Sequence, residues 1–490
     1  MDHEELRSLP IKKLWQLFEE NDGVDQGEVG VVLASKLAKS RNQVESIAVA
    51  EKVVKIGETL ANNYFVAEGY FWIGWSNYSL RRFDESYEAY KTCVGYYMQD
   101  GLEQSAATGI GNAIDGLLEM DKTQDAYEFS LEGLNLARKV NATREIGYLG
   151  RQFIRACRAL NRLQEVIDVA PEIIHAWNQL NDSDEVVRVR DSYADCLYDV
   201  GELDLALELF RENEKVARVL EMRGYEAYAI LKQARIHLDK GEKQRGLQIA
   251  ERALEFCLER KLLWYAALAH YYIAESGIKS RIESLEHVDE AIALITTTSG
   301  ADSSLYADLL TLKINMTQYF TEYADECYSA LFDLYSWSSA SADRIRQKAF
   351  VEVRMFEKYL DDGLQEDADE MYAQVQNTLK EFESGEHNDF LFIRFGATEL
   401  QLLLSQQKFN EVIEHGFEYL QEYQQHRTYD IQIPIAYETI GDAFHALGDD
   451  RALEMWRNAV ILFSHMDASI WAKDVAGKLL DTVKVPGQLL

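Results

Sequence analysis

The sequence predicts an all-α fold: a solenoid of about eleven helix pairs stacked into a superhelix. Three observations support this prediction. Proline is scarce, a turn signature recurs at intervals near 40 residues, and apolar residues between the turns follow helical spacing.

Proline is nearly absent from the 490 residues, which contain only Pro10, Pro171, Pro434 and Pro486. Proline interrupts helices because it lacks an N–H group and its ring clashes with the preceding turn. A chain this poor in proline can be helical over almost its whole length. The alternating Val, Ile and Thr runs typical of strands are missing, so we expect little strand.

The turn signature lies between the two helices of each pair, as at 80–83, 160–163 and 200–203. A small or apolar residue follows it on the second helix and gives a marker series with steps of 40 residues, then 41, 41, 44 and 40: Ser46, Ser86, Ala126, Val166, Ala206, Gly246, Glu286, Cys327, Ala368, Val412 and Ala452. A fixed period of this kind indicates a repeat architecture, in which each pair buries its apolar face against its neighbours. Four glycines at the turns are expected to end a helix in the left-handed conformation: Gly201, Gly241, Gly363 and Gly448.

The marker series also divides the chain. We expect an N-terminal capping helix region at 1–28, a first block of repeats at 29–294, a degenerate repeat or hinge at 295–345, a second block at 346–463, and a C-terminal capping helix and tail at 464–490. The third segment stands out because runs rich in Thr, Ser and Gly at 296–300 and 336–341 interrupt the pattern.

The composition excludes several classes of function. With 50 Lys and Arg against 83 Asp and Glu, the formal net charge is −33, which disfavours nucleic acid as the main partner. The N-terminus does not resemble a signal peptide and no run of about 18 apolar residues occurs, so we predict a cytoplasmic protein without membrane insertion. An odd number of widely spaced cysteines is expected as reduced, mostly buried thiols: Cys93, Cys157, Cys196, Cys257 and Cys327.

Catalytic signatures are missing from the sequence. It contains no HExxH motif, no Walker-type glycine loop, no GxSxG elbow and no GxGxxG motif after a strand. The ten histidines show no paired ligand spacing. We therefore predict a non-enzymatic protein with no metal and no cofactor. An enzyme with a cryptic site, such as a Cys/His pair from distant repeats, is the less favoured alternative.

Two units carry a family resemblance. The segment 437–448, Tyr-Glu-Thr-Ile-Gly-Asp-Ala-Phe-His-Ala-Leu-Gly, continues with Ala452 and resembles the tetratricopeptide repeat family. Phe71-Trp72-Ile73-Gly74 with Phe83, Ser86 and Tyr90 is a second match. The resemblance covers roughly 29–463 and implies inner helices that line a concave groove. The period near 40 is longer than the simplest family period of about 34 and resembles the extended type found in kinesin light chains and in peptide-sensing regulators of Gram-positive bacteria.

A basic cluster is the conspicuous candidate site. Arg151, Arg155, Arg158 and Arg162 fall at i, i+4, i+7 and i+11, which predicts four guanidinium groups along one face of one helix. By the resemblance, the first three occupy the groove register. Neighbouring repeats carry in the same register an aromatic end and acidic neighbours: Phe71, Trp75, Tyr78, Gly111, Asp115, Asp191, Asp195, Tyr198, Leu231 and Arg235.

Two interpretations of this cluster stay open. The groove could bind a partner peptide, helix or domain with acidic and apolar side chains, because Arg binds carboxylates bidentately. Alternatively, Asp191 and Asp195 could neutralise the arginines within the molecule. The predicted function is a non-enzymatic protein-interaction scaffold, and the alternative is a peptide- or protein-responsive regulator that changes its superhelix shape on binding. The oligomeric state is not predicted.

Overall fold

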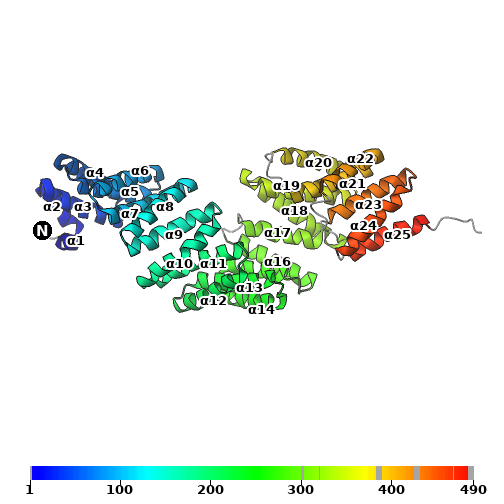
Figure 1. The fold of residues 1–490 in the computed structure, drawn as a ribbon, viewed down its shortest axis with the longest axis horizontal. Helices are drawn as coiled ribbons and strands as arrows, with labels where there is room; N and C mark the ends of the chain where they lie inside the picture. Colours follow the sequence, from blue (N-terminus) through cyan, green and yellow to red (C-terminus); the bar gives the residue numbers. More distant parts are fainter. Residues whose placement is uncertain are drawn as a thin grey trace, which may run out of the picture. The chain divides into compact units, whose positions relative to one another are not determined.

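The computed structural model describes residues 3–298, 303–318, 320–381, 389–423, 431–466 and 468–483. The chain divides into two compact units, unit 1 (Met1–Ile278) and unit 2 (Lys279–Leu490). The regular elements of the described residues are 25 α-helices and two short 3-10 helices, without a strand (Figure 1). The predicted all-α fold class is confirmed.

Unit 1 contains fifteen α-helices in its described residues. They are α1 (His3–Ser8), α2 (Ile11–Glu20), α3 (Gly23–Lys39), α4 (Gln43–Leu60), α5 (Asn63–Ser79), α6 (Phe83–Gln99), α7 (Glu103–Glu119), α8 (Thr123–Lys139), α9 (Thr143–Ala159), α10 (Leu163–Gln179), α11 (Ser183–Asp199), α12 (Leu203–Val219), α13 (Arg223–Asp239), α14 (Lys243–Glu259) and α15 (Leu263–Glu275).

Unit 2 contains the other ten α-helices and the 3-10 helices Thr321–Tyr323 and Ala342–Arg344. The α-helices are α16 (Arg281–Thr296), α17 (Ser304–Thr317), α18 (Ala324–Ser339), α19 (Ile345–Asp361), α20 (Gln365–Lys380), α21 (Asp389–Ser405), α22 (Phe409–Tyr423), α23 (Gln432–Ala446), α24 (Arg451–His465) and α25 (Ser469–Val483). The predicted tail at 484–490 and residues 299–302 and 319 of the predicted degenerate repeat lie outside the described residues.

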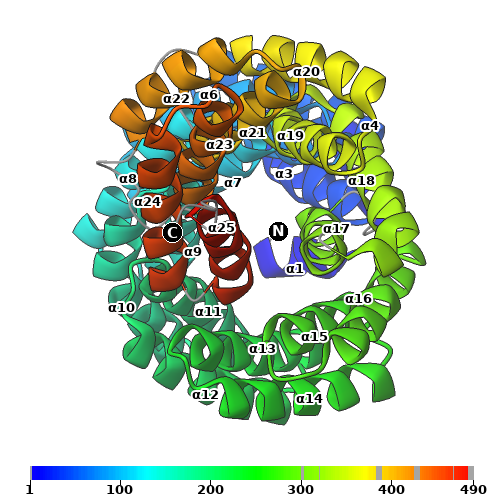
Figure 2. The same ribbon diagram turned by 90° about the vertical axis from the view of Figure 1, so that its right-hand side faces the viewer.

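The 40-residue period is most regular in unit 1. The first helices of its pairs, from α3 to α13, are each 17 residues long and begin at 23, 63, 103, 143, 183 and 223. From α2 to α15 each helix packs against the next one in the chain, and successive odd-numbered helices from α3 to α15 also contact one another. Within each unit, the odd-numbered helices therefore line the inner side of the curve and the even-numbered helices the outer side (Figure 2).

The turns between helices use the left-handed conformation, as predicted. Gly201 and Gly241 have φ of 89° and 76°, and Gly363 and Gly448 both have φ of 72°. Other turns place a non-glycine residue in the same conformation, for example Asn161 with φ of 56°. The conformation therefore belongs to the repeat, and glycine is only the least strained way to adopt it.

Small residues let paired helices approach closely. The buried Ser86 hydroxyl donates to the Gly74 carbonyl oxygen at 2.9 Å, which joins α6 to α5. In the unit that best resembles the tetratricopeptide family, a Cβ at Gly441 would lie 2.5 Å from Trp456 Cδ1. The close contact between α23 and α24 therefore requires glycine at this position.

The marker series is wrong at one position. Glu286 is exposed, and Ser284 occupies the buried place in α16. The reason is that α15 ends after 13 residues at the Ser276-Gly277 turn, so that α16 begins earlier than the 40-residue period requires. The boundary between the two units follows this shortened helix and precedes the predicted degenerate repeat at 295–345.

All five cysteines are buried and form no disulfide, in agreement with the prediction of buried thiols. Burial raises the pKa of Cys157 and Cys257 to about 12 and that of Cys196 to about 11. These thiols are small core groups with little thiolate character. None of the described helices combines the length and the apolar character needed to cross a bilayer.

Candidate partner-binding site

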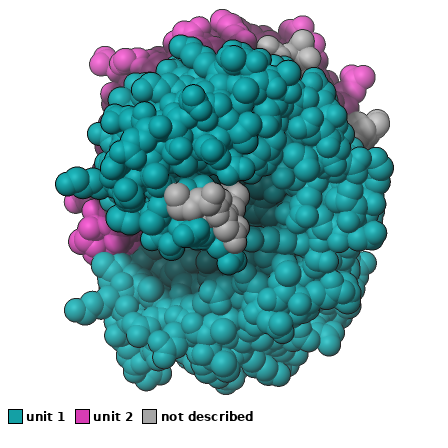
Figure 3. Space-filling model, turned by 90° about the vertical axis from the view of Figure 1, so that its left-hand side faces the viewer, with its two compact units in different colours: residues 1–278 teal, residues 279–490 magenta. Residues whose placement is uncertain are grey.

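A cleft of about 710 Å³ opens on the inner helices of unit 1. Its lining residues come from the middle of α5 onward, the middle of α7, the first half of α9, the end of α10 and the start of α11. Figure 3 shows the hollowed face of unit 1. We call this the inner-face cleft, and its lining residues are Phe71, Trp75, Thr108, Asn112, Arg144, Glu145, Tyr148, Arg151, Trp177, Leu180, Asp182 and Glu185.

Aromatic rings form much of this lining. Trp72 is buried in the core, whereas Trp75, on the same helix, is 38% exposed and lines the cleft. The two indole rings have their centroids 6.2 Å apart, and Phe71 meets Trp72 edge to face at 5.2 Å. The cleft side of α5 is therefore an aromatic surface supported by a second aromatic layer.

Two glycines make room for the remaining rings. A Cβ at Gly111 would lie 2.3 Å from Cε1 of Tyr148, and a Cβ at Gly147 would lie 2.7 Å from Cε2 of Trp177. Tyr148 lies across α7 and donates a hydrogen bond to Asp115 at 2.8 Å. The shape of the inner-face cleft thus depends on missing side chains at both positions.

Four buried polar atoms of the cleft lack a hydrogen-bond partner among the described residues: Glu145 Oε2, Trp177 Nε1, Arg151 Nε and Glu185 Oε2. Arg151 Nε and Glu185 Oε2 lie 3.5 Å apart, close enough for an ion pair only. Glu145 and Trp177 are more than nine-tenths buried, and the other carboxylate oxygen of Glu145 accepts from Gln104 at 3.2 Å. Such orphaned groups are uncommon in folded proteins, because each costs about 1–3 kcal/mol.

A second feature of the inner helices is a row of alternating charges 40 residues apart. This charge row consists of Asp115, Arg155, Asp195, Arg235 and Glu275, each at the same position of its helix. Arg155 pairs with Asp115 at 3.0 Å, and Arg235 pairs with Glu275 at 2.6 Å. Asp115 and Glu275 thus neutralise arginines of neighbouring repeats.

Asp115 and Asp195 of the charge row each accept from several donors. Asp115 also accepts from Gln152 Nε2 at 2.8 Å. Asp195 is buried and accepts from Arg158 at 3.2 Å, from Tyr228 at 2.8 Å and from Lys232 at 2.9 Å. This part of the inner surface is an intramolecular network.

Asp191, one turn before Asp195, has a different environment. It is buried, accepts a hydrogen bond from Asn213 at 2.9 Å, and makes no ion pair in the described part of the chain. Burial raises the pKa of the Asp191 carboxyl to about 7, the Asn213 hydrogen bond opposes that rise, and the Asp195 charge adds to it. Asp191 therefore forms no direct ion pair with an arginine, which the intramolecular interpretation expected, although the charges of Lys232 and Arg158 lower its pKa.

The structure brings together three of the predicted site residues, Phe71, Trp75 and Arg151, in the inner-face cleft. Tyr78 instead packs edge to face on Phe83 at 5.5 Å and does not line the cleft. The other predicted residues, Arg155, Arg158, Asp191, Asp195, Tyr198 and Arg235, form the contacts of the charge row and its surroundings.

The prediction of four arginines on one helix is wrong for Arg162. The helix α9 ends at Ala159, a left-handed Asn161 follows, and Arg162 precedes α10. Its guanidinium lies 4.1 Å from the centroid of the Tyr127 ring and pairs with Glu165. The i, i+11 spacing misled because a turn of the 40-residue repeat falls inside it.

Sequence reasoning missed Glu145 and Trp177. Neither lies in the groove register considered, since Trp177 is on an outer helix and Glu145 is near the start of α9. Four members of the charge row, Asp115, Arg155, Asp195 and Arg235, were placed in the groove register, but Glu275 and the alternation of sign at 40-residue intervals were missed.

Comparisons with known proteins add structures of similar fold. Neither a family model nor a curated protein matches the chain. One solved structure is a signal transduction ATPase with numerous domains and a tetratricopeptide repeat sensor from Pyrococcus horikoshii, at 13% identity and a TM-score of 0.46, covering 67% of this chain and 53% of that one. This chain thus spans about half the length of that protein.

Two others are apo proteins matched over almost their full length. The apo form of RapI matches at 12% identity and a TM-score of 0.49, covering 73% of this chain and 98% of RapI. The apo quorum sensor NprR from B. thuringiensis matches at 13% identity and a TM-score of 0.45, covering 71% and 97%. None of these likenesses is close enough to assign a function.

Proposed function

We propose that this protein is a non-enzymatic binding scaffold whose unit 1 holds an extended peptide segment of a partner protein in the inner-face cleft. The observation that carries the proposal is the convergence in one cleft of orphaned polar atoms and aromatic rings, among them the exposed Trp75. Orphaned groups at a cleft are satisfied when a ligand supplies their partners.

A peptide backbone suits these orphaned atoms. Each peptide unit offers one N–H donor and one carbonyl acceptor. The Glu145 carboxylate can accept a hydrogen bond from a peptide N–H, and the Trp177 indole N–H can donate one to a peptide carbonyl. Glu145 on α9 and Trp177 on α10 both line the inner-face cleft, so we expect one extended segment bound there to meet both.

The side chains of the ligand are expected to include an apolar or aromatic anchor. Phe71 and Trp75 present a surface for such an anchor, as aromatic residues do at protein interfaces. Arg144 is exposed at the cleft and makes no ion pair within the described ranges, so an acidic side chain can approach it. Arg151 is less available because Glu185 lies beside it.

The test starts from a random peptide library selected on the full chain. Affinities of the recovered peptides are then measured by calorimetry on the Trp177→Phe variant, which keeps one aromatic ring and loses the indole N–H. We expect at least a tenfold loss of affinity, about 1.4 kcal/mol. The smaller phenyl ring also leaves a cavity at this buried position, so the variant should be somewhat less stable than the parent, and its melting curve checks that it is folded at the temperature of the titration.

Trp264→Ala is the matched control, because Trp264 on α15 is also 38% exposed and does not line the cleft. Peptides that bind Trp264→Ala as the parent and lose affinity on Trp75→Ala support the proposal. Peptides that bind all of these variants alike would exclude the inner-face cleft as the site.

A peptide-responsive regulator is the second candidate, because the cleft is lined by helices of several consecutive repeats that one ligand would join. Such a regulator changes its superhelix shape on binding. Spin labels at Arg41 and Lys261, exposed turn residues of unit 1, would report this change of shape. A passive scaffold keeps the label distance on peptide binding, whereas a regulator of this kind changes it.

A further inference from the structure

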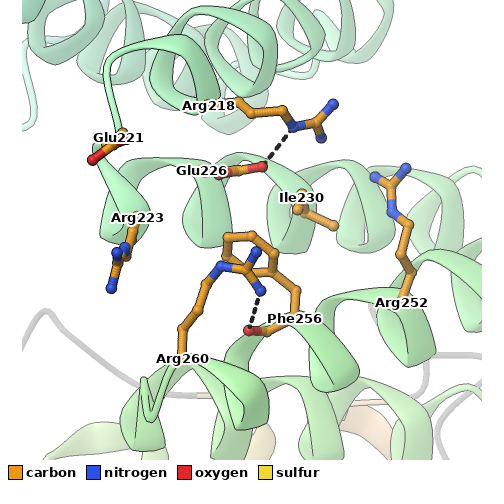
Figure 4. A pocket seen from close by; sticks show the side chains of 8 residues that line it. All are labelled: Arg218, Glu221, Arg223, Glu226, Ile230, Arg252, Phe256 and Arg260. Carbon is orange, nitrogen blue, oxygen red and sulfur yellow. Dashed lines mark hydrogen bonds and ion pairs between the residues drawn. The ribbon is translucent and has the colours of Figure 1, made fainter.

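A second cleft of unit 1, of about 420 Å³, is lined by four arginines. Arg218 comes from α12, Arg223 from α13, Arg252 from α14, and Arg260 directly follows α14. Figure 4 shows their side chains around Ile230 and Phe256, with Glu221 and Glu226 as the acidic members of the lining. We call this the arginine cleft.

Beneath this cleft, three buried positions break the apolar pattern of the repeat. Glu214, Glu226 and Gln233 are all buried. At 40-residue intervals, the positions equivalent to Glu214 carry Val94, Leu134, Ile174 and Leu254. The positions equivalent to Glu226 carry Ala106, Ile146, Val186 and Ala266, and those equivalent to Gln233 carry Ala113, Phe153, Tyr193 and Ile273. Burying carboxylates where neighbours bury apolar groups costs stability, so the exception needs a reason.

The buried carboxylates hold two of the arginines. Arg218 donates from Nε to Glu226 and from a terminal nitrogen to Glu214, both at 2.7 Å. Arg252 donates to the second oxygen of Glu214 at 3.3 Å, and Gln233 donates to the same oxygen at 2.7 Å. Both arginine side chains remain more than half exposed, at 58% and 53%. Their guanidinium groups are thus fixed from below while further N–H groups remain for a ligand.

The other two arginines complete the lining. The Arg260 guanidinium lies 4.0 Å from the centroid of the Phe256 ring and pairs with Glu259 at 2.8 Å. Arg223 is exposed and makes no ion pair in the portion of the chain that the structure describes. Four guanidinium groups therefore line one cleft of a chain whose net charge is −33.

We propose that the arginine cleft binds an oxyanion, a phosphate or a carboxylate, carried by a side chain of a peptide ligand. Guanidinium groups bind both oxyanions with paired N–H donors, and clusters of arginine recognise phosphorylated and acidic motifs. The four arginines line a single cleft of about 420 Å³ on an acidic chain, which suits a local anionic group better than a nucleic acid backbone. This site uses α12–α14 and does not depend on the inner-face cleft.

Three blocked peptides of equal length test the proposal on the full chain: Gly-pSer-pSer-Gly, Gly-Glu-Glu-Gly and Gly-Ser-Ser-Gly. We expect the phosphorylated peptide to bind at least about tenfold more tightly than the serine peptide in titrations at low salt. Comparable binding of the glutamate peptide identifies carboxylates as a second source of the anion. Failure of both anionic peptides to exceed the serine peptide overturns the proposal.

The variant Arg223→Gln/Arg260→Gln removes two cleft charges without touching the buried carboxylates. We expect it to lower the affinity for the phosphorylated peptide at least about tenfold. Arg41→Gln/Arg82→Gln is the control, because it removes two exposed turn arginines of unit 1 outside the cleft. Equal losses in both variants, or a single-stranded RNA of equal charge binding more tightly than the peptide, would overturn the peptide site. Melting curves of both variants check that they fold.

Discussion

The inner-face cleft and the charge row both involve the inner helices of unit 1, yet their polar groups differ in how completely they are hydrogen-bonded. In the charge row, buried Asp195 accepts from Arg158, Tyr228 and Lys232. In the cleft, the Glu145 carboxylate and the Trp177 N–H each keep an atom without a partner among the described residues. Both regions are rich in charge, so charge alone does not distinguish them.

This difference in hydrogen bonding indicates where a ligand is expected to bind. Saturated buried groups contribute to stability and have little capacity left for a ligand, because each lone pair is already used. Orphaned groups cost free energy in the free protein, and a ligand that pairs them recovers that cost. The charge row is therefore predicted to be structural, and the inner-face cleft to be functional.

The largest loss of stability is expected when the Asp195 carboxylate is removed. The Asp195→Ala variant leaves Lys232 and Arg158 without their buried counter-ion, and breaking a buried pair on one side costs about 3–5 kcal/mol. Native-state hydrogen exchange of the α11 and α13 amides measures this loss locally, which suits a repeat protein that does not unfold in one step.

Asp199→Ala is the matched control, because Asp199 is an exposed carboxylate on the same helix. Asp199→Ala should change the opening free energy of α11 by no more than about 0.5 kcal/mol. A loss below about 1 kcal/mol for Asp195→Ala would contradict a structural charge row.

The fold was predictable from the sequence because it repeats. A weak local signal, such as a small residue after a turn, becomes strong when it recurs every 40 residues, and Ser46 and Ser86 are buried as expected. The prediction failed at Glu286, where α15 is shorter than the helices at the equivalent place in earlier pairs. Periodicity alone cannot report a helix that ends early.

The site was predictable only in part. Helical register selected Phe71, Trp75 and Arg151 as groove residues, and all three line the cleft. Register does not report hydrogen-bond satisfaction, which depends on contacts between repeats. For this reason Arg155 and Arg158 were grouped with Arg151, although the structure pairs them with Asp115 and Asp195.

A smaller effect is expected at Asp191, whose carboxyl has its pKa raised to about 7 by burial. The folded chain holds this proton at pH values where the unfolded chain, with a pKa of about 3.9, has lost it. Stability therefore falls as pH rises from about 4 and levels off above about 7. Between pH 5 and pH 8 this group should lower the opening free energy of α11 by about 3 kcal/mol.

The Asp191→Asn variant removes this titration and should be more stable than the parent at pH 8. Hydrogen exchange of α11 in the two proteins at pH 5 and pH 8 gives the difference, in which the other titrating groups cancel. Asp191→Asn and Asp195→Ala would then shift stability in opposite directions, although the two residues lie one turn apart. A parent and variant with parallel pH profiles would show that Asp191 is ionised throughout.

We expect Gly111→Ala to lower the stability of unit 1 by about 1–3 kcal/mol, because overpacking a tight contact has this cost. The added Cβ would lie 2.3 Å from the Tyr148 ring and would push it towards the cleft. Peptides selected on the parent should lose affinity while the Asp195 network is retained. Gly477→Ala, where a Cβ meets no atom within 4 Å, is the control. An unchanged affinity would show that the Tyr148 wall does not shape the site.

The smallest effect is expected from Arg155→Gln, and it separates the two interpretations of the basic cluster. The Arg155 side chain is 48% exposed, and Asp115 keeps donors from Tyr148 and Gln152 when the guanidinium is lost. An exposed ion pair contributes about 0.5 kcal/mol, so the stability change should be close to that value. Because Arg155 does not line the inner-face cleft, peptide affinity should change less than twofold, whereas Arg151→Gln should weaken it. Calorimetry with one selected peptide on both variants makes the comparison. A larger loss for Arg155→Gln than for Arg151→Gln would place an acidic partner on the charge row and would reverse the roles assigned to the two regions.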